Sequence, residues 1–310
     1  MFMSYRKDTA KRNALLTFAY CSFSFFFFMY IWSNVFYAFR GITLGKLTWI
    51  LVCISVYIYS QKLAYSMETA DSREIHKNFN ILILSEVANE ISRNLSGYLH
   101  VPGPLLKDVG FLAFAELNNK LLERFGDILT LIPFVILFII AFTMDSKRIG
   151  KFIADLLRIF SMFYIVRSCC IWVTLLPGPA PHCRPGGSFR PPQDWIDVIG
   201  HMPVDGISFT TCGDLVPSGH IGFVTIALVA ILRELPRRFL SYRKNFVLGC
   251  FLYELITGYF IIATRKHYTV DVVVGFFLSF FITIIFKDGW KPALFGNEDS
   301  YIPLPVDSQV

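Results

Sequence analysis

The chain has 310 residues, of which 54% are hydrophobic, 17% are charged and 32 are Phe. A soluble globular protein is about 45–50% apolar and about 25% charged. This apolar excess is too large for one soluble core, because a surface in contact with water needs more polar residues than remain. The composition also excludes the disordered, collagen-like and disulfide-scaffold classes. It therefore predicts an integral membrane protein.

Apolar runs of about 20 residues, the length that crosses a bilayer as a helix, recur along the chain. The clear spans predicted are Ala14–Phe39, Ile42–Lys62, Gly126–Met144, Phe152–Leu176, Val216–Leu235, Phe246–Thr264 and Tyr268–Phe286. The segment Phe79–His100 has the right length, but five polar residues interrupt it: Glu86, Asn89, Glu90, Arg93 and Asn94. Polar residues within a span usually face the interior of a bundle. This segment is therefore either a core-facing helix or an interfacial amphipathic one.

The placement of Lys and Arg decides between seven and eight spans, because these residues concentrate on the cytosolic side. With eight spans and a cytosolic N-terminus, the inner segments hold about twice as many Lys and Arg residues as the outer ones. With seven spans, the basic loop Arg233–Lys244 would lie outside. Eight spans are favoured. The basic loops also account for the net charge of +6, so nucleic-acid binding is not expected.

Two of the seven cysteines, Cys183 and Cys212, fall in the one long outer segment, Pro177–Pro217. If that side faces the lumen of the secretory pathway, a disulfide between them is permitted. The spacing alone does not establish that their geometry allows it.

One stretch of chain, Cys212–His220, leads directly into an apolar run, so Ser218 and Gly219 stand at a predicted helix start. Backbone N–H groups at a helix start bind anions, and His220 is placed to exchange a proton with a group held there. The alternative is a capping turn with a structural histidine.

A second stretch, Arg265–Asp271, contains His267 and Asp271 four residues apart, which would share one face of a helix. A carboxylate held against one imidazole nitrogen makes the other a better nucleophile or base. The alternative is an ion pair at the membrane edge with flanking cations. Because both stretches lie on the outer side in the eight-span topology, together they favour a phosphoryl-transfer site with two histidines. The sequence has no metal-ligand or nucleotide-loop motif, and no cofactor or metal is expected.

These motifs resemble the sphingolipid synthases, within the phosphatidic acid phosphatase type 2 superfamily. Sphingomyelin synthases carry a Cys-Gly-Asp…Ser-Gly-His segment and a His-Tyr-Thr-Val-Asp-Val-Val-Val segment, which stand here as Cys212–His220 and His267–Val274. The segment Arg167–Pro179 is similar to that family's helix-end motif. The plant-type inositol phosphorylceramide synthases are nearer still, through segments such as Tyr98–Pro104 and Ile261–Asp271.

The resemblance implies an all-α, polytopic membrane bundle with a six-helix catalytic core over residues 79–288. A cytosolic tail with an additional transmembrane helix pair (1–78) would precede this core, and a cytosolic tail (289–310) would follow it. The resemblance also implies an active site on the lumenal face of the Golgi, or of the endoplasmic reticulum. Ceramide would be the acceptor, a glycerophospholipid the donor and diacylglycerol a product.

Carried over residue by residue, the resemblance implies a double displacement. His267 would be the nucleophile and Asp271 its orienting carboxylate, while His220 would protonate the departing diacylglycerol and then deprotonate the ceramide hydroxyl. Substrate-binding roles are expected for Asp214, Ser218, Gly219, Arg167 and Arg265.

Two departures from the family leave hydrolase activity open: Ile221 replaces a usual Thr, and Pro217 precedes the Ser-Gly-His as in phosphatases. The Lys-x6-Arg-Pro element of the phosphatases is not found in the sequence, which argues against a simple phosphatase. The predicted head group is phosphoinositol, with phosphocholine as the alternative. A lipid phosphatase or phospholipase C-type hydrolase and a non-catalytic scaffold are further hypotheses, and the oligomeric state is not predicted.

Overall fold

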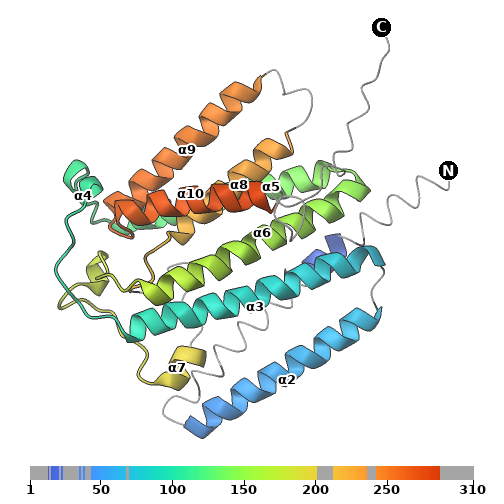
Figure 1. Cartoon of the computed structure of the whole chain (residues 1–310), viewed down its shortest axis with the longest axis horizontal. Coiled ribbons are helices and arrows are strands. Elements are labelled where there is room, and N and C mark those ends of the chain that lie inside the picture. The colour runs from blue at the N-terminus through green and yellow to red at the C-terminus, as the bar shows by residue number, and fades with distance from the viewer. Residues whose placement is uncertain are drawn as a thin grey trace.

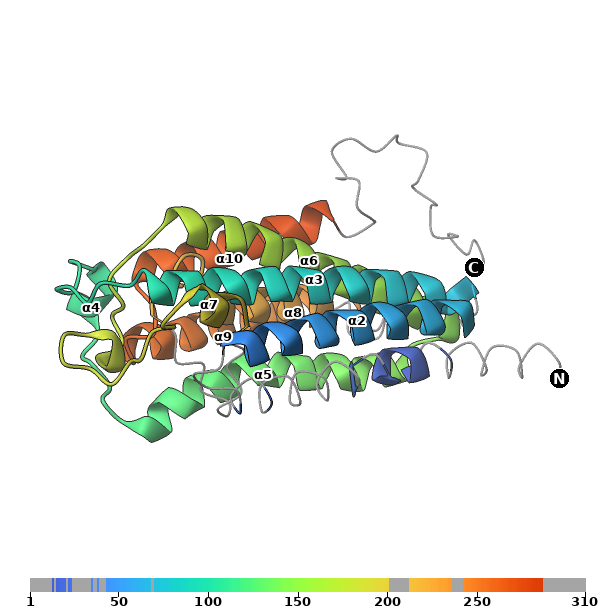
Figure 2. The same cartoon turned by 90° about the horizontal axis from the view of Figure 1, so that it is seen from below.

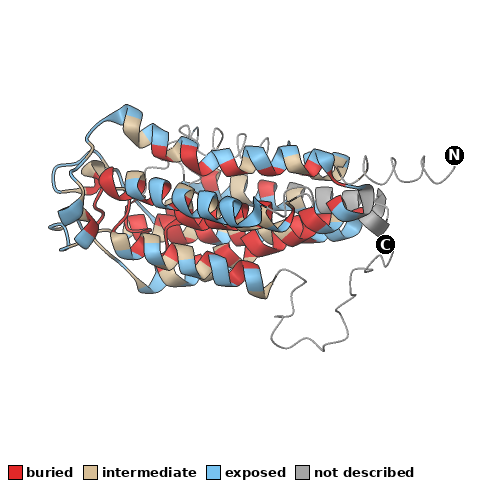
Figure 3. Cartoon of the chain, turned by 90° about the horizontal axis from the view of Figure 1, so that it is seen from above, coloured by how far each residue is buried: buried red, intermediate tan, exposed pale blue. Residues whose placement is uncertain are grey.

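A computed structural model describes residues 43–67, 70–200, 212–235 and 242–286, together with residues 13, 15–20, 22–23, 35 and 38. Within these residues the chain is helical, with connecting loops and no strand. The long helices run along one common axis (Figures 1 and 2). Buried residues gather along the middle of the bundle, and exposed ones lie on its outside (Figure 3). The predicted all-α membrane bundle is confirmed.

Seven long helices make up the described bundle: α2 (Thr43–Met67), α3 (Ala70–Tyr98), α5 (Lys120–Thr143), α6 (Ser146–Val173), α8 (Gly219–Arg233), α9 (Arg243–Ala263) and α10 (Thr269–Ile285). Three shorter pieces complete it: α4 (Val109–Ala113), the 3-10 helix η1 (Pro181–Cys183) and α7 (Trp195–Gly200). The helix α5, residues Arg148–Val173 of α6 and the helix α9 are long and apolar enough to cross a membrane. Shorter apolar helices cover Thr43–Tyr59, Gly219–Arg233 and Thr269–Ile285. Most of the predicted first span, Ala14–Phe39, lies outside the described residues.

The polar helix α3 faces the interior of the bundle, which decides between the two alternatives for the segment Phe79–His100. It packs side by side with α6 (Figure 1), and the side chains of Asn89, Glu90, Arg93 and Asn94 are buried. The α6 residue Trp172 donates its indole N–H to Ser92 Oγ at 2.7 Å. The polar residues of α3 therefore find partners inside the protein, as membrane-buried polar groups require.

The six helices α3, α5, α6, α8, α9 and α10 alternate in direction. As a result α3, α6 and α9 end, and α5, α8 and α10 begin, at the end of the bundle that carries α4, η1 and α7 (Figure 2). This end holds both sequence motifs. At the opposite end the Arg158 guanidinium joins two carboxylates, Asp155 at 2.7 Å and Glu74 on α3 at 3.3 Å. Arg233 at the end of α8 contacts Asp155 at 3.3 Å, so ion pairs connect three helices there.

The helix α2 lies outside the six-helix group and packs on α3 and α7. Tyr57 donates to Asn80 of α3 at 3.2 Å, and the buried Lys46 ammonium forms an ion pair with Asp197 of α7. The segment Thr43–Met67 is therefore attached to the bundle along its length and at the motif-bearing end.

Candidate active site

His220 is the second residue of α8, and a close approach of α10 fixes the turn before it. Ser218 caps α8 with an extended backbone, and its N–H donates to the Asp271 carbonyl of α10 at 3.0 Å. This approach depends on Gly275, where an added Cβ would lie 2.8 Å from the Ser218 carbonyl oxygen. The first turns of α8 and α10 are therefore held together by backbone contact.

His267 lies in the short connection between α9 and α10, and Asp271 lies in the first turn of α10. Asp271 is fully buried, and its Oδ2 accepts the Tyr268 N–H at 2.8 Å while lying 3.4 Å from His267 Nδ1. At that separation the His267–Asp271 contact is an ion-pair approach and not a well-formed hydrogen bond. The predicted pairing is found, but the predicted local structure is wrong, because His267 precedes the helix instead of sharing a helical face with Asp271.

The two histidines meet at the motif-bearing end of the bundle. Their ring centroids are 5.6 Å apart, with the rings inclined at 71°. The His220 side chain is 26% exposed and the His267 side chain is 7% exposed. A reacting group held between them would therefore touch both rings while being largely screened from water.

A carboxylate that the sequence interpretation missed faces His220. Asp127, in the second turn of α5, places Oδ1 3.2 Å from His220 Nε2. The Lys266 ammonium pairs with the same carboxylate and donates to the Glu123 carbonyl oxygen at 3.1 Å. The signal was present in the sequence, because Asp127 stands inside the predicted span Gly126–Met144, and an ionisable residue within a span is a candidate functional residue by default.

Arg167 and Asp214, both predicted to bind substrate, bind each other and the turn that leads into α8. The Arg167 guanidinium donates to the Pro217 carbonyl at 3.1 Å, to Asn89 Oδ1 at 2.9 Å and to Asp214 Oδ2 at 3.2 Å. Asp214 also accepts from Arg93 Nε at 3.0 Å. The structure therefore brings both residues close to the site, where they hold the turn before His220.

Arg265, also predicted to bind substrate, extends away from the histidine pair toward α4. Its backbone has φ 59°, and its guanidinium lies 4.1 Å from the Phe111 ring centroid. It donates to the Phe114 carbonyl at 3.0 Å and lies 3.8 Å from Glu116. Burial lowers the pKa of Arg265. The adjacent Lys266, and not Arg265, supplies the cation beside the histidines.

Ser218 and Gly219, the remaining predicted substrate-binding residues, stand at the start of α8 beside both histidine-bearing segments. The Ser218 side chain is fully buried, and its Oγ has no hydrogen-bond partner among the described residues. A Cβ on Gly219 would lie 3.4 Å from Arg167 Nε. The turn therefore offers an unused hydroxyl and helix-start N–H groups close to His220.

The loop before α4 anchors the start of α10. Asp108 accepts the Thr269 N–H at 2.8 Å and the Thr269 hydroxyl at 2.6 Å. Tyr268 donates its hydroxyl to the Pro177 carbonyl at 2.9 Å. Two loops therefore fix the segment that carries His267.

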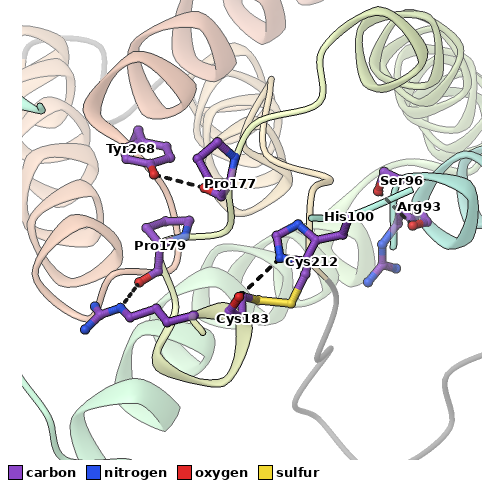
Figure 4. The surroundings of a disulfide bond; sticks show 9 residues. Arg93, Ser96, His100, Pro177, Pro179, Cys183, Cys212 and Tyr268 are labelled. Atoms are coloured by element: carbon purple, nitrogen blue, oxygen red, sulfur yellow. Dashed lines mark hydrogen bonds between the residues drawn. A yellow bond between two sulfur atoms is a disulfide. The ribbon is translucent and has the colours of Figure 1, made fainter. Parts of the chain in front are cut away.

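A disulfide joins the two loops nearest the site (Figure 4). Cys183 and Cys212 are bonded, with Cα atoms 5.7 Å apart, as the sequence permitted. His100 Nε2 lies 3.2 Å from the Cys183 carbonyl oxygen, and Arg184 donates to the Pro179 carbonyl at 2.9 Å. The bond connects η1 to the segment Cys212–Ser218, which leads into α8.

Comparison with known proteins finds a family model and relatives that match this chain. Residues 211–288, which hold both histidines and Asp271, match the family model described as PAP2 superfamily C-terminal. The chain is 30% identical over 219 residues to a phosphatidylinositol:ceramide inositolphosphotransferase of Oryza sativa subsp. indica. It is 29% identical over 217 residues to phosphatidylinositol:ceramide inositolphosphotransferase 3 of Arabidopsis thaliana. The predicted resemblance to the sphingolipid synthases is confirmed.

The match covers 68% of this chain and 65% of the rice protein, and 67% of this chain and 72% of the Arabidopsis protein. A phosphatidylcholine:ceramide cholinephosphotransferase 2 of Mus musculus is 31% identical over 128 residues, which is 39% of this chain and 34% of the mouse protein. The chain therefore spans just under two thirds of the length of the rice relative, and a smaller part of it resembles the cholinephosphotransferase.

Proposed function

We propose that this chain is a ceramide phosphotransferase that moves phosphoinositol from phosphatidylinositol to ceramide and releases diacylglycerol. The observation that carries the proposal is the pair His220 and His267, each ring facing its own carboxylate, the partly buried Asp127 or the fully buried Asp271. One imidazole nitrogen of each ring faces a carboxylate, and the other nitrogen remains available for nucleophilic attack or proton transfer. Two such rings are what a double displacement at phosphorus requires.

In the first step Nε2 of His267 attacks phosphorus, and the bond between phosphorus and the diacylglycerol oxygen breaks. His220 gives its proton to that oxygen, so diacylglycerol leaves as an alcohol and the phosphoinositol group stays on His267. Asp271 stabilises the imidazole as it gains positive charge. Asp127 does the same for His220 in its protonated form.

In the second step His220, now neutral, takes the proton of the ceramide primary hydroxyl. The ceramide oxygen attacks phosphorus, the bond between phosphorus and His267 breaks, and both histidines return to their starting protonation states. The phosphoryl oxygens would be held by the N–H groups at the start of α8, the Ser218 hydroxyl and the Lys266 ammonium, because helix starts and cations stabilise anionic oxygens.

Phosphoinositol is favoured over phosphocholine because the relatives named as inositolphosphotransferases match 67–68% of the chain, whereas the mouse cholinephosphotransferase matches 39%. The proposed location is a Golgi or endoplasmic reticulum membrane with the site in the lumen. The positive charge on the opposite side and the Cys183–Cys212 disulfide near the site support this orientation. We also propose that residues 79–288 form the catalytic core and residues 1–78 an addition to it.

The test uses membranes that contain the full chain, fluorescent ceramide and either phosphatidylinositol or phosphatidylcholine. A ceramide product formed with phosphatidylinositol supports the proposal, and His267→Ala should abolish it. A product formed only with phosphatidylcholine would show that the transferred head group is phosphocholine and not phosphoinositol. Release of inositol phosphate without any ceramide product would identify a hydrolase instead, and full turnover by His267→Ala would remove the nucleophile assignment.

A further inference from the structure

An apolar cavity of about 490 Å³ lies inside the bundle, beside the candidate active site but distinct from it. Its wall is formed by α3, α5, α6 and the N-terminal residues Leu15, Phe18 and Ser22. A volume of 300–1,000 Å³ is typical of pockets that enclose a small organic ligand. The cavity therefore has the size of a binding site, and part of its wall comes from the additional N-terminal segment.

The cavity is elongated along the helices. On α6 its lining runs from Phe152 to Tyr164, which at about 1.5 Å per residue corresponds to roughly 18 Å. Half of the hydrocarbon core of a bilayer is about 15 Å thick. The cavity is therefore about as long as one lipid chain within one leaflet.

One end of this cavity is polar. Glu86 and Tyr164 line it there. One carboxyl oxygen, Glu86 Oε2, is buried and has no hydrogen-bond partner among the described residues. Buried carboxyl oxygens are normally hydrogen-bonded, so an unused one at the end of an apolar cavity points to a ligand with a hydrogen-bond donor.

The polar end of the cavity reaches the part of α8 that follows His220 by about one helical turn. The rings of Tyr164 and Phe223 have centroids 5.5 Å apart, and Phe223 follows His220 by three residues on α8, close to one helical turn. Arg167, three residues after Tyr164 on α6, donates to the Pro217 carbonyl in the turn before His220. A lipid chain in the cavity would therefore have its polar end close to the reacting histidines.

The chemistry of this end distinguishes between the two lipids of the proposed reaction. Ceramide carries an amide N–H and hydroxyl groups where its chains meet the head, and these are hydrogen-bond donors. A diacyl glycerophospholipid carries two ester groups at the same depth, which only accept hydrogen bonds. Ceramide carries donors as well as acceptors and can therefore satisfy a buried carboxyl in either protonation state, whereas an ester can satisfy only the protonated one.

We propose that this cavity binds one hydrocarbon chain of ceramide, with Glu86 accepting a hydrogen bond from the ceramide amide or hydroxyl. The identity of the lipid rests on the proposed function, whereas the site itself rests on the cavity and the unused oxygen. Glu86 is a specificity-determining residue in this proposal and takes no part in the transfer steps. Leu15, Phe18 and Ser22 close the cavity on one side.

Photo-crosslinking tests the site directly. Membranes with the full chain would receive ceramide that carries a diazirine in one hydrocarbon chain, and labelled peptides would be mapped by mass spectrometry. Expected labels lie on the N-terminal segment near Phe18 and on the cavity face of α6, in the wild type and in His267→Ala. Diazirine-bearing phosphatidylinositol should label these peptides much less. Labels confined to lipid-facing residues, or equal labelling by both lipids, would overturn the proposal.

Two variants give an independent kinetic test. Glu86→Leu should raise the apparent KM for ceramide about tenfold, the loss expected when one buried hydrogen bond to the ligand is removed. The KM for phosphatidylinositol should not change. Ala141→Phe, which fills the cavity, should impair long-chain ceramide more than a chain-shortened ceramide. Ala88→Phe, on the exposed face of α3, is its matched control and should have no such effect.

The two proposals fail in different ways. If no ceramide product forms but ceramide labels the cavity, the proposed function fails and the binding site stands. If transfer occurs while the label lies elsewhere and Glu86→Leu and Ala141→Phe leave the KM for ceramide unchanged, the binding site fails and the proposed function stands.

Discussion

At the scale of single residues, the site consists of two histidine–carboxylate pairs from four segments. The pair His267 and Asp271 could be predicted from sequence because its members are four residues apart. The pair His220 and Asp127 could not be predicted in the same way, because its members are 93 residues apart and only the packing of α5 on α8 brings them together. Polar residues within spans are expected to face the interior of the bundle, but no sequence pattern assigns partners among residues so far apart.

Replacing Asp127 tests the second pair. In Asp127→Asn the ring of His220 keeps a hydrogen-bonding neighbour but loses the charge that stabilises its protonated form, so kcat should fall about 10²-fold or more. The measurement is turnover at saturating ceramide and phosphatidylinositol. Glu123→Gln is the matched control, because Glu123 contacts Lys266 through its backbone carbonyl and the change should leave kcat within a factor of about two.

Arg167 tests whether a predicted substrate-binding residue is in fact a structural one. Its guanidinium makes hydrogen bonds in several directions within the protein, and Lys cannot reproduce that planar fork. Arg167→Lys should therefore lower both the thermal stability and the activity, since each buried acceptor left without its hydrogen bond costs about 1–3 kcal/mol. Melting in detergent is the readout. An unchanged melting temperature with a raised KM for phosphatidylinositol would instead favour direct phosphate contact.

At the scale of elements, sequence patterns do not show which helices pack against one another. The helix α3 could be predicted only as one of two alternatives, because its polar residues are equally compatible with an interfacial position until their partners on α6 and in the Cys212–Ser218 turn are known. The meeting of α8 and α10 also could not be predicted, since Gly275 looks like any other glycine in an apolar helix.

Gly275→Ala tests the contact between α8 and α10. The added methyl group would lie 2.8 Å from the Ser218 carbonyl oxygen and 3.2 Å from its nitrogen, so the backbones must separate. Activity should fall at least about tenfold, because a displacement of about 1 Å in a catalytic constellation has large effects on rate. Gly249→Ala in α9 is the control, since nothing lies within 4 Å of its added Cβ. Equal activity of the two variants would contradict the role given to this contact.

At the scale of the whole molecule, the direction of the helices follows from the sequence more readily than their contacts do. The predicted spans from Phe79 onward correspond to α3, α5, α6, α8, α9 and α10. All but α3 are apolar runs separated by polar loops, and α3 is recognised by its length despite its polar residues. The predicted ends differ by several residues, as at Val216–Leu235 against Gly219–Arg233. The loops at the motif-bearing end could not be predicted in detail, because their structure depends on capping contacts and one disulfide between segments distant in sequence.

The Cys183–Cys212 disulfide is expected to affect the stability of the whole bundle. Closing a loop between Cys183 and Cys212, which are 29 residues apart, is expected to contribute about 3–4 kcal/mol to stability. Because the bond holds the segment that leads into α8, Cys212→Ser should lower both the melting temperature and the turnover, and a reductant should do the same to the wild type. Cys250→Ser is the matched control, since Cys250 is a free cysteine in α9, and it should respond to reductant like the wild type.

Non-reducing mass spectrometry of the purified protein should recover the peptides of Cys183 and Cys212 as one linked species. Recovery of both as free thiols from fully active protein would contradict this account of how the loop is held, and the start of α8 would then depend on Arg167 and Gly275 alone.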